Sequence, residues 1–298
     1  MEWDQIKTED RNQHSANIDT LSTLEMVKLI NDEDKKVAYA VEAQLEQIAA
    51  AVDVITEQLR QNGRLVYIGC GTSGRLGVLD AAECPPTYST DPGQVIGLIA
   101  GGPNAMFRAV EGAEDDAEMG ERDLKAIDFD SRDVLVGIAA SGRTPYVVRA
   151  MEYAKSCDAH VIGVACCTGS EVEKAAEIAI VPMPGPEVIT GSTRMKSATA
   201  QKMVLNMLST CAMIKLGKVY GNLMVDVKAS NQKLIHRCRR IVSEATGVSE
   251  EKADESLNQC EYRPKVAIVM LLRGVDAVQA QKMLEKCDGQ IARVIKEG

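Results

Sequence analysis

Three glycine-rich stretches of the sequence carry serine and threonine hydroxyls of the kind that bind phosphate groups. They are Gly69-Cys70-Gly71-Thr72-Ser73-Gly74, Ser141-Gly142-Arg143-Thr144 and Gly191-Ser192-Thr193-Arg194. Glycine lets backbone N–H groups approach an anion, each hydroxyl can donate a further hydrogen bond, and a following helix adds its positive N-terminal end. In any one stretch the hydroxyls can instead serve only as helix caps. Because the pattern recurs, we predict a phosphorylated substrate bound by Gly71, Thr72, Ser73, Ser141, Gly142, Arg143, Thr144, Ser192 and Thr193.

The first of these stretches also satisfies the Gly-x-Gly-x-x-Gly pattern of dinucleotide-binding proteins. That fingerprint requires an acidic residue near the end of the second strand, where it binds the ribose. Here the corresponding segment is Ile99-Ala100-Gly101-Gly102-Pro103, which contains no acid. A Walker loop is excluded as well, because no Gly-Lys-Ser/Thr follows. We therefore expect no nucleotide cofactor.

The charge balance narrows the classes of partner. The 298 residues include 34 Lys and Arg against 43 Asp and Glu, a formal net charge of -9. Nucleic-acid-binding proteins usually carry a basic excess or a basic stripe. No stretch approaches the ~18 uninterrupted apolar residues of a membrane span. We expect neither a nucleic acid nor a membrane as a partner.

The cysteines and histidines argue against disulfides and against a metal site. Nine cysteines are an odd count in a long chain, and no charged N-terminal region leads into an apolar signal segment. These features predict a reducing, cytoplasmic environment. No Cys-x-x-Cys pair occurs, and His14, His160 and His236 lie too far apart in sequence to form a local ligand motif, so we expect no metal.

Short apolar runs alternate with helical segments through the first two thirds of the chain. Apolar residues at helical spacing predict a helix from Asp34 to Asn62, which Gly63 ends. Buried strands are predicted over five runs: Arg64 to Ile68, Val95 to Ala100, Asp133 to Ala139, His160 to Ala165 and Ile178 to Met183. This alternation predicts an α/β fold, a parallel sheet covered by helices on both faces. The phosphate-binding stretches would then meet at the carboxyl edge of one sheet.

The remainder of the chain is predicted to be helical. Met195 to Leu216 is apolar on more than one face, which is typical of a core or subunit-interface helix. From about Thr246, three short helices are expected to begin near Ser249, Pro264 and Asp276. We therefore expect an N-terminal helical extension (1–54), a phosphate-binding α/β domain (55–245) and a C-terminal helical bundle (246–298).

Several segments match the motifs of a known family. They are the run from Gly69 to Gly77 with its continuation Asp80-Ala81-Ala82-Glu83-Cys84-Pro85-Pro86-Thr87-Tyr88, Val110 to Asp115, Ile138 to Tyr146, and Gly221-Asn222-Leu223-Met224-Val225-Asp226. In these segments the sequence resembles the N-acetylmuramic acid 6-phosphate etherases, over essentially the whole chain. The resemblance implies a sugar isomerase (SIS) domain, which is a flavodoxin-like parallel sheet that binds sugar phosphates. It also implies a UBA-like three-helix bundle at the C-terminus and a relation to the glucokinase regulatory protein.

The reaction that the resemblance implies is cleavage of the D-lactyl ether at C3 of the sugar, in cell-wall amino sugar recycling or catabolism. In the ring-opened sugar, C2–H lies α to the C1 aldehyde and the ether oxygen lies β to it, so lactate can be eliminated. Syn addition of water then gives N-acetylglucosamine 6-phosphate. Two carboxylates suffice as base and acid, and no metal or organic cofactor is required.

The resemblance assigns Glu83 as the proton donor to lactate and Glu114 as a second catalytic residue, the base for the C2 proton. Pro85 and Pro86 are expected to end the preceding helix and so to aim Glu83 into the cleft. Glu111 lies one helical turn before Glu114 and is its rival for the same face. Which carboxylate is the acid and which the base stays open at this point.

Two other functions remain compatible with these residues. A related isomerase would use the same phosphate loops and enediol chemistry but would release no lactate. A non-catalytic sugar-phosphate sensor, similar to the glucokinase regulatory protein, would bind the same ligands and regulate a partner. The resemblance and the long apolar helices favour a homodimer, and the C-terminal bundle is expected either to cover the cleft or only to stabilise the main domain.

Overall fold

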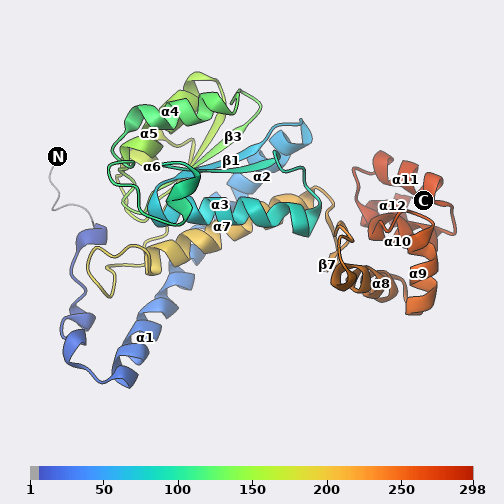
Figure 1. Cartoon of the computed structure of the whole chain (residues 1–298), viewed down its shortest axis with the longest axis horizontal. Coiled ribbons are helices and arrows are strands. Elements are labelled where there is room, and N and C mark those ends of the chain that lie inside the picture. The colour runs from blue at the N-terminus through green and yellow to red at the C-terminus, as the bar shows by residue number, and fades with distance from the viewer. Residues whose placement is uncertain (1–6, 298) are drawn as a thin grey trace. The chain divides into compact units, whose positions relative to one another are not determined.

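The computed structural model describes residues 7–297 and divides into two compact units (Figure 1). The first consists of Met1–Ala82 with Gly93–Ser209, and the second of Glu83–Pro92 with Thr210–Gly298. The domain boundaries expected from the sequence, after residues 54 and 245, stay predictions. Residues 1–6 of the expected N-terminal extension lie outside the described residues.

A five-stranded parallel sheet forms the centre of the first unit. Its strands are β1 (Leu65–Gly69), β2 (Val95–Ile99), β3 (Val134–Ile138), β4 (His160–Val164) and β5 (Ile178–Ile180). Their order is β2-β1-β3-β4-β5, so the chain reverses its direction across the sheet between β1 and β3. This is the flavodoxin-like order, in which ligands bind outside the carboxyl ends of the strands at the reversal. The predicted parallel α/β sheet is confirmed.

Helices cover both faces of this sheet, as the continuous apolar strands require. The helices α4 (Ala117–Ala126) and α5 (Pro145–Ser156) lie on one face and share a buried core with β1 and β3 (Figure 1). On the opposite face, α3 (Gly71–Tyr88) packs tightly against the sheet, and α7 (Lys196–Lys215) runs alongside α3. The expected helix over Met195 to Leu216 is therefore confirmed as α7.

The N-terminal helix differs from the prediction. In place of one helix from Asp34 to Asn62, the chain forms α1 (Thr23–Glu42) and α2 (Leu45–Arg60). The break falls at Ala43 and Gln44, where the side-chain oxygen of Gln44 accepts a hydrogen bond from the backbone of Val181 at 2.8 Å. The apolar spacing continues across this two-residue break, so periodicity could not show it.

The expectation that Pro85 and Pro86 end α3 beside Glu83 is wrong. Both prolines lie inside the helix, which continues to Tyr88. A proline removes its own N–H donor and crowds the carbonyl one turn before it, but its own carbonyl still accepts a hydrogen bond. The N–H of Ser89 donates to the carbonyl of Pro85 at 3.0 Å, which completes the last turn.

The second unit is helical apart from a short hairpin. The hairpin is β6 (Val219–Tyr220) with β7 (Leu223–Met224), and the helices are α8 (Gln232–Thr246), α9 (Glu250–Asn258), α10 (Pro264–Arg273), α11 (Ala277–Lys286) and α12 (Ile291–Glu297). The three expected helices are confirmed as α9, α10 and α11, capped by Ser249 and Asp276 or opened by Pro264. The fourth, α12, was not predicted. It packs with α8 through α11 around one apolar core.

The remaining elements of residues 7–297 are short. They are α6 (Glu171–Ala175) and the 3-10 helices η2 (Lys7–Glu9), η3 (Gln13–Ser15), η4 (Ile18–Thr20) and η5 (Pro103–Met106). Within these described residues, no helix has the length and apolar character needed to cross a membrane.

Candidate active site

A cavity of about 620 Å³ opens in the first unit where β1 and β3 end. Its walls come from the residues after β1, the residues after β3, and the segment before α7. The sequence-predicted residues that line it are Gly71, Thr72, Ser73, Glu114, Ser141, Arg143, Thr144 and Thr193. The three glycine-rich stretches, far apart in the sequence, therefore lie around one cavity at the carboxyl edge of the sheet.

Two helices begin at this cavity. The helix α3 starts at Gly71, directly after β1, and α5 starts at Pro145 with Thr144 as its N-cap residue. Gly71 has φ of +52°, and a Cβ on Gly74 would lie 2.6 Å from the carbonyl oxygen of Gly69, so the tight passage from strand to helix needs glycine. The first turn of α3 offers unpaired N–H groups to an anion. In the first turn of α5, Pro145 has no N–H, and the N–H groups of Tyr146 and Val147 already donate to the carbonyls of Glu114 and Thr144, so α5 contributes the positive end of its dipole.

Polar groups of the loop after β3 remain available to a ligand. The side chain of Thr144 makes no capping hydrogen bond, so this hydroxyl is not simply a helix cap. The Nε atom of Arg143 is buried and has no hydrogen-bond partner. A buried guanidinium nitrogen without an acceptor is costly, and a bound phosphate oxygen would supply one.

The hydroxyl of Ser73 is engaged differently. It donates to Oε1 of Gln201 on α7 at 2.8 Å, and the Ser73 residue is only 7% exposed. Its backbone N–H belongs to the first turn of α3. Gln201 was not predicted from the sequence, because nothing in α7 distinguishes this glutamine from a solvent-exposed one.

Four residues singled out from the sequence are not among those that line the cavity. Gly142 is buried with φ of +66°, and a Cβ there would lie 2.3 Å from Oγ of Ser170, so it shapes the loop. Ser192 lies between the lining residues Gly191 and Thr193, and Glu111 is exposed in the turn that leads to Glu114. Glu83 is exposed on α3, about three helical turns beyond Thr72, and belongs to the second unit, whereas the cavity belongs to the first.

Carboxylates also line the cavity. Glu114 is joined there by Asp115 and by Glu9, neither of which was identified from the sequence. Glu114 lies close enough to the Cys70 thiol to affect it. Burial, and then the charge of Glu114, raise the pKa of Cys70 above its ordinary value, so this thiol stays protonated at neutral pH.

The donor set of the site does not resemble a metal centre. Within residues 7–297, no group of three or more His, Cys, Asp and Glu side chains is arranged to hold a metal ion. The cavity instead combines hydroxyls, helix N-termini, one arginine and carboxylates. That combination suits a phosphorylated sugar, since backbone N–H groups bind the phosphate and carboxylates accept from hydroxyls.

Comparisons with known proteins agree with this class. The model of the SIS domain matches residues 113–210, and that of the glucokinase regulatory protein N-terminal SIS domain matches residues 47–155. The C-terminal lid domain of glucokinase regulatory protein matches residues 221–269. A phosphoheptose isomerase from Neisseria gonorrhoeae has the same fold, with a TM-score of 0.50 and 19% identity over 64% of this chain and 98% of its own. The main domain is thus a SIS domain.

Similar sequences define the family. An N-acetylmuramic acid 6-phosphate etherase from Photorhabdus laumondii is 60% identical over 97% of this chain and 96% of its own length. Another, from Clostridium botulinum, is 56% identical over 99% of this chain and 97% of its own length. The chain belongs to the N-acetylmuramic acid 6-phosphate etherase family, as its motifs predicted.

Proposed function

We propose that this chain cleaves the D-lactyl ether of N-acetylmuramic acid 6-phosphate, giving D-lactate and N-acetylglucosamine 6-phosphate. The observation that carries the proposal is the cavity at the ends of β1 and β3, where hydroxyls and helix N-termini face a carboxylate, Glu114. Family membership makes the lactyl sugar the substrate to test first. The reaction belongs to cell-wall amino sugar recycling or catabolism, in the cytoplasm.

The phosphate is bound by the first turn of α3 and by the hydroxyls of the loops around it. The N–H groups of Thr72 and Ser73 and the side chains of Ser141 and Thr144 supply donors, and Arg143 supplies a charge. Gly142 shapes the loop after β3, and Ser192 and Thr193 stay predicted substrate-binding residues. An acidic chain can thus bind an anionic sugar because the positive potential is local.

The chemistry proceeds through the ring-opened sugar. Glu114 removes the C2 proton, which the C1 aldehyde makes acidic, and the bond from C3 to the lactyl oxygen breaks as a carbon–carbon double bond forms. The proton for the departing oxygen is assigned to Glu83 by the family resemblance alone, because Glu83 does not line the cavity. Water then adds to C3 on the same face while a proton returns to C2, so one water molecule is consumed for each lactate released.

The active assembly is proposed to be a homodimer. On α1, the apolar side chains of Leu24, Val27 and Tyr39 are 63%, 58% and 73% exposed in the single chain. Large apolar side chains exposed along one helix suit a surface that a partner covers. Equilibrium sedimentation tests this proposal directly.

Incubation of the purified chain with N-acetylmuramic acid 6-phosphate tests the function. The proposal expects D-lactate and N-acetylglucosamine 6-phosphate in equal amounts, without added metal or nucleotide. A sugar phosphate isomerised without lactate release would indicate an isomerase. Tight sugar-phosphate binding with no turnover would indicate a sensor, and either outcome would contradict the proposal.

A further inference from the structure

The N-terminal segment, residues 7–20, brings a carboxylate into the cavity that the proposed mechanism does not use. Glu9, at the end of η2, lines the cavity together with Gly191 and Thr193. Its Oε2 atom lies 3.0 Å from the position that a Cβ on Gly191 would occupy. Gly191 therefore leaves room for the Glu9 carboxylate beside the loop that precedes α7.

This segment is fixed by hydrogen bonds to the same loop. The side chain of Asn12 donates to the carbonyl of Pro186 at 3.1 Å, and the hydroxyl of Ser15 donates to the carbonyl of Val188 at 2.7 Å. Asn12 and Ser15 are buried. These two hydrogen bonds join chain segments that are more than 170 residues apart in sequence. The bonded residues lie a few positions from Glu9 in the first segment and a few positions from Gly191 in the second.

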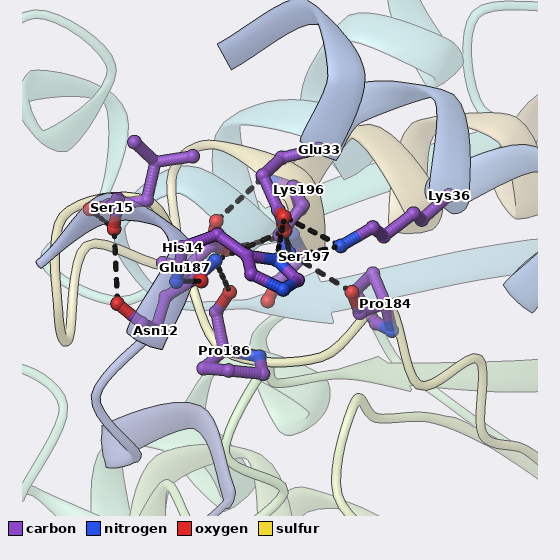
Figure 2. Close-up of polar contacts among 11 residues, drawn as sticks. Asn12, His14, Ser15, Glu33, Lys36, Pro184, Pro186, Glu187, Lys196 and Ser197 are labelled. Carbon is purple, nitrogen blue, oxygen red and sulfur yellow. Dashed lines mark hydrogen bonds and ion pairs between the residues drawn. The ribbon is translucent and has the colours of Figure 1, made fainter. Parts of the chain in front are cut away.

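A buried ionic cluster stabilises both the N-terminal segment and the loop that precedes α7 (Figure 2). The ammonium group of Lys196, at the start of α7, donates to Glu33 on α1 at 2.7 Å, and Asn12 donates to the same Glu33 oxygen at 3.0 Å. The fully buried carboxylate of Glu187 accepts the backbone N–H groups of Lys196 and Ser197, each at 2.9 Å. Each buried charge is paired or hydrogen-bonded, as burial requires.

We propose that Glu9 is a substrate-contacting residue whose carboxylate accepts hydrogen bonds from the hydroxyl-bearing part of the bound sugar, and that Asn12 positions it. The inference rests on the proposed function for the identity of the sugar phosphate. Both the phosphate and the lactyl carboxylate of the substrate are anionic and would repel Glu9. Its carboxylate must therefore face the neutral hydroxyls, for which a carboxylate oxygen is a strong acceptor.

Calorimetric titration of Glu9 variants with N-acetylglucosamine 6-phosphate and with inorganic phosphate tests this role. Glu9→Ala should weaken binding of the sugar phosphate ~10- to 100-fold, the effect of losing a charged hydrogen bond. It should not weaken inorganic phosphate binding, because it removes a negative charge from the cavity. Glu9→Gln, which keeps one acceptor oxygen, should lie between Glu9→Ala and the parent chain. Asp10→Asn removes the same charge from the adjacent exposed residue and should bind both ligands as the parent does.

Two results would overturn the assignment. One is unchanged sugar-phosphate affinity in Glu9→Ala, and the other is an equal loss for sugar phosphate and inorganic phosphate. If the parent chain releases no D-lactate while Glu9→Ala still weakens only the sugar phosphate, the proposed function fails and the role of Glu9 stands. If lactate is released and Glu9→Ala binds normally, only the role of Glu9 fails.

The positioning role of Asn12 is tested by a double-mutant cycle. Asn12→Ala should weaken sugar-phosphate binding in the parent chain but add nothing in the Glu9→Ala background, because its effect passes through Glu9. A general loss of folding would instead weaken binding by the same factor in both backgrounds. That outcome would contradict the positioning role.

Discussion

Ser73 and Ser141 follow neighbouring strands and line the same cavity, yet their hydroxyls differ in what they can offer a phosphate. The Ser73 hydroxyl donates to Gln201, whereas the predicted phosphate contact of Ser141 is made by its side chain. We expect Ser141→Ala to weaken N-acetylglucosamine 6-phosphate binding ~10- to 100-fold. Ser73→Ala should weaken it less, because the backbone N–H at the start of α3 remains. Calorimetry on both variants checks this, and an equal loss in both would contradict it.

Local sequence predicted the binding loops but not every residue around the cavity. Glycine next to Ser or Thr is a local signal, and the loops that it singled out, with Thr72, Ser141 and Thr193, line one cavity. Glu9 lies in a short polar segment without periodicity, and its position depends on contacts such as that of Ser15 with Val188. Such long-range contacts leave no pattern in the sequence near Glu9. The roles of Glu83 and Glu114 remain proposals.

The packing of α3 against the sheet depends on glycines that leave no space for a side chain. A Cβ on Gly97, in β2, would lie 2.5 Å from the Cα atom of Val78 in α3. We expect Gly97→Ala to destabilise the first unit by about 1–3 kcal/mol or more, the usual cost of overpacking. Urea unfolding measures the change.

Gly93→Ala provides the matched control, because a Cβ there would have no heavy atom within 4 Å. It lies two residues before β2 and should leave the unfolding midpoint close to that of the parent chain. If Gly97→Ala is as stable as Gly93→Ala, the close approach of α3 and β2 is not a constraint on the fold.

The sequence predicted elements well where one physical signal dominates. Each of the first four strands begins and ends within one residue of its predicted limits, because a strand buried on both faces is a continuous apolar run. The break between α1 and α2 was missed because the apolar spacing continues across it, and the hydrogen bond that Gln44 accepts there comes from Val181, far away in the sequence. The continuation of α3 through Pro85 was missed because a proline near the end of a helix removes few hydrogen bonds.

At the scale of the whole molecule, the buried pair of Glu33 and Lys196 should make stability depend on acid. Burial alone would raise the pKa of the Glu33 carboxyl, but hydrogen bonds from Lys196, Lys36, His14 and Asn12 outweigh it and hold the pKa well below its ordinary value. A carboxyl with a lowered folded-state pKa adds stability that is complete above its unfolded pKa, ~4.3, and is lost as pH falls towards the folded-state value.

We therefore expect the urea midpoint of the first unit to fall as pH is lowered below ~4.3. The double variant Glu33→Gln with Lys196→Met removes both charges, so no buried charge is left unpaired. Its stability should decline less steeply over the same pH range. An equally steep decline in the double variant would show that other groups cause the acid sensitivity.

The central claim is that the chain eliminates lactate by removing the C2 proton and then adds water to C3. Its most direct test is the reaction of the parent chain with N-acetylmuramic acid 6-phosphate in D₂O containing ¹⁸O, with the product analysed by NMR and mass spectrometry. The account predicts a solvent deuterium at C2 and a solvent oxygen at C3 of the N-acetylglucosamine 6-phosphate, with no solvent oxygen entering the lactate hydroxyl. A product that retains its original hydrogen at C2, or lactate that has taken its hydroxyl oxygen from water, would contradict the account.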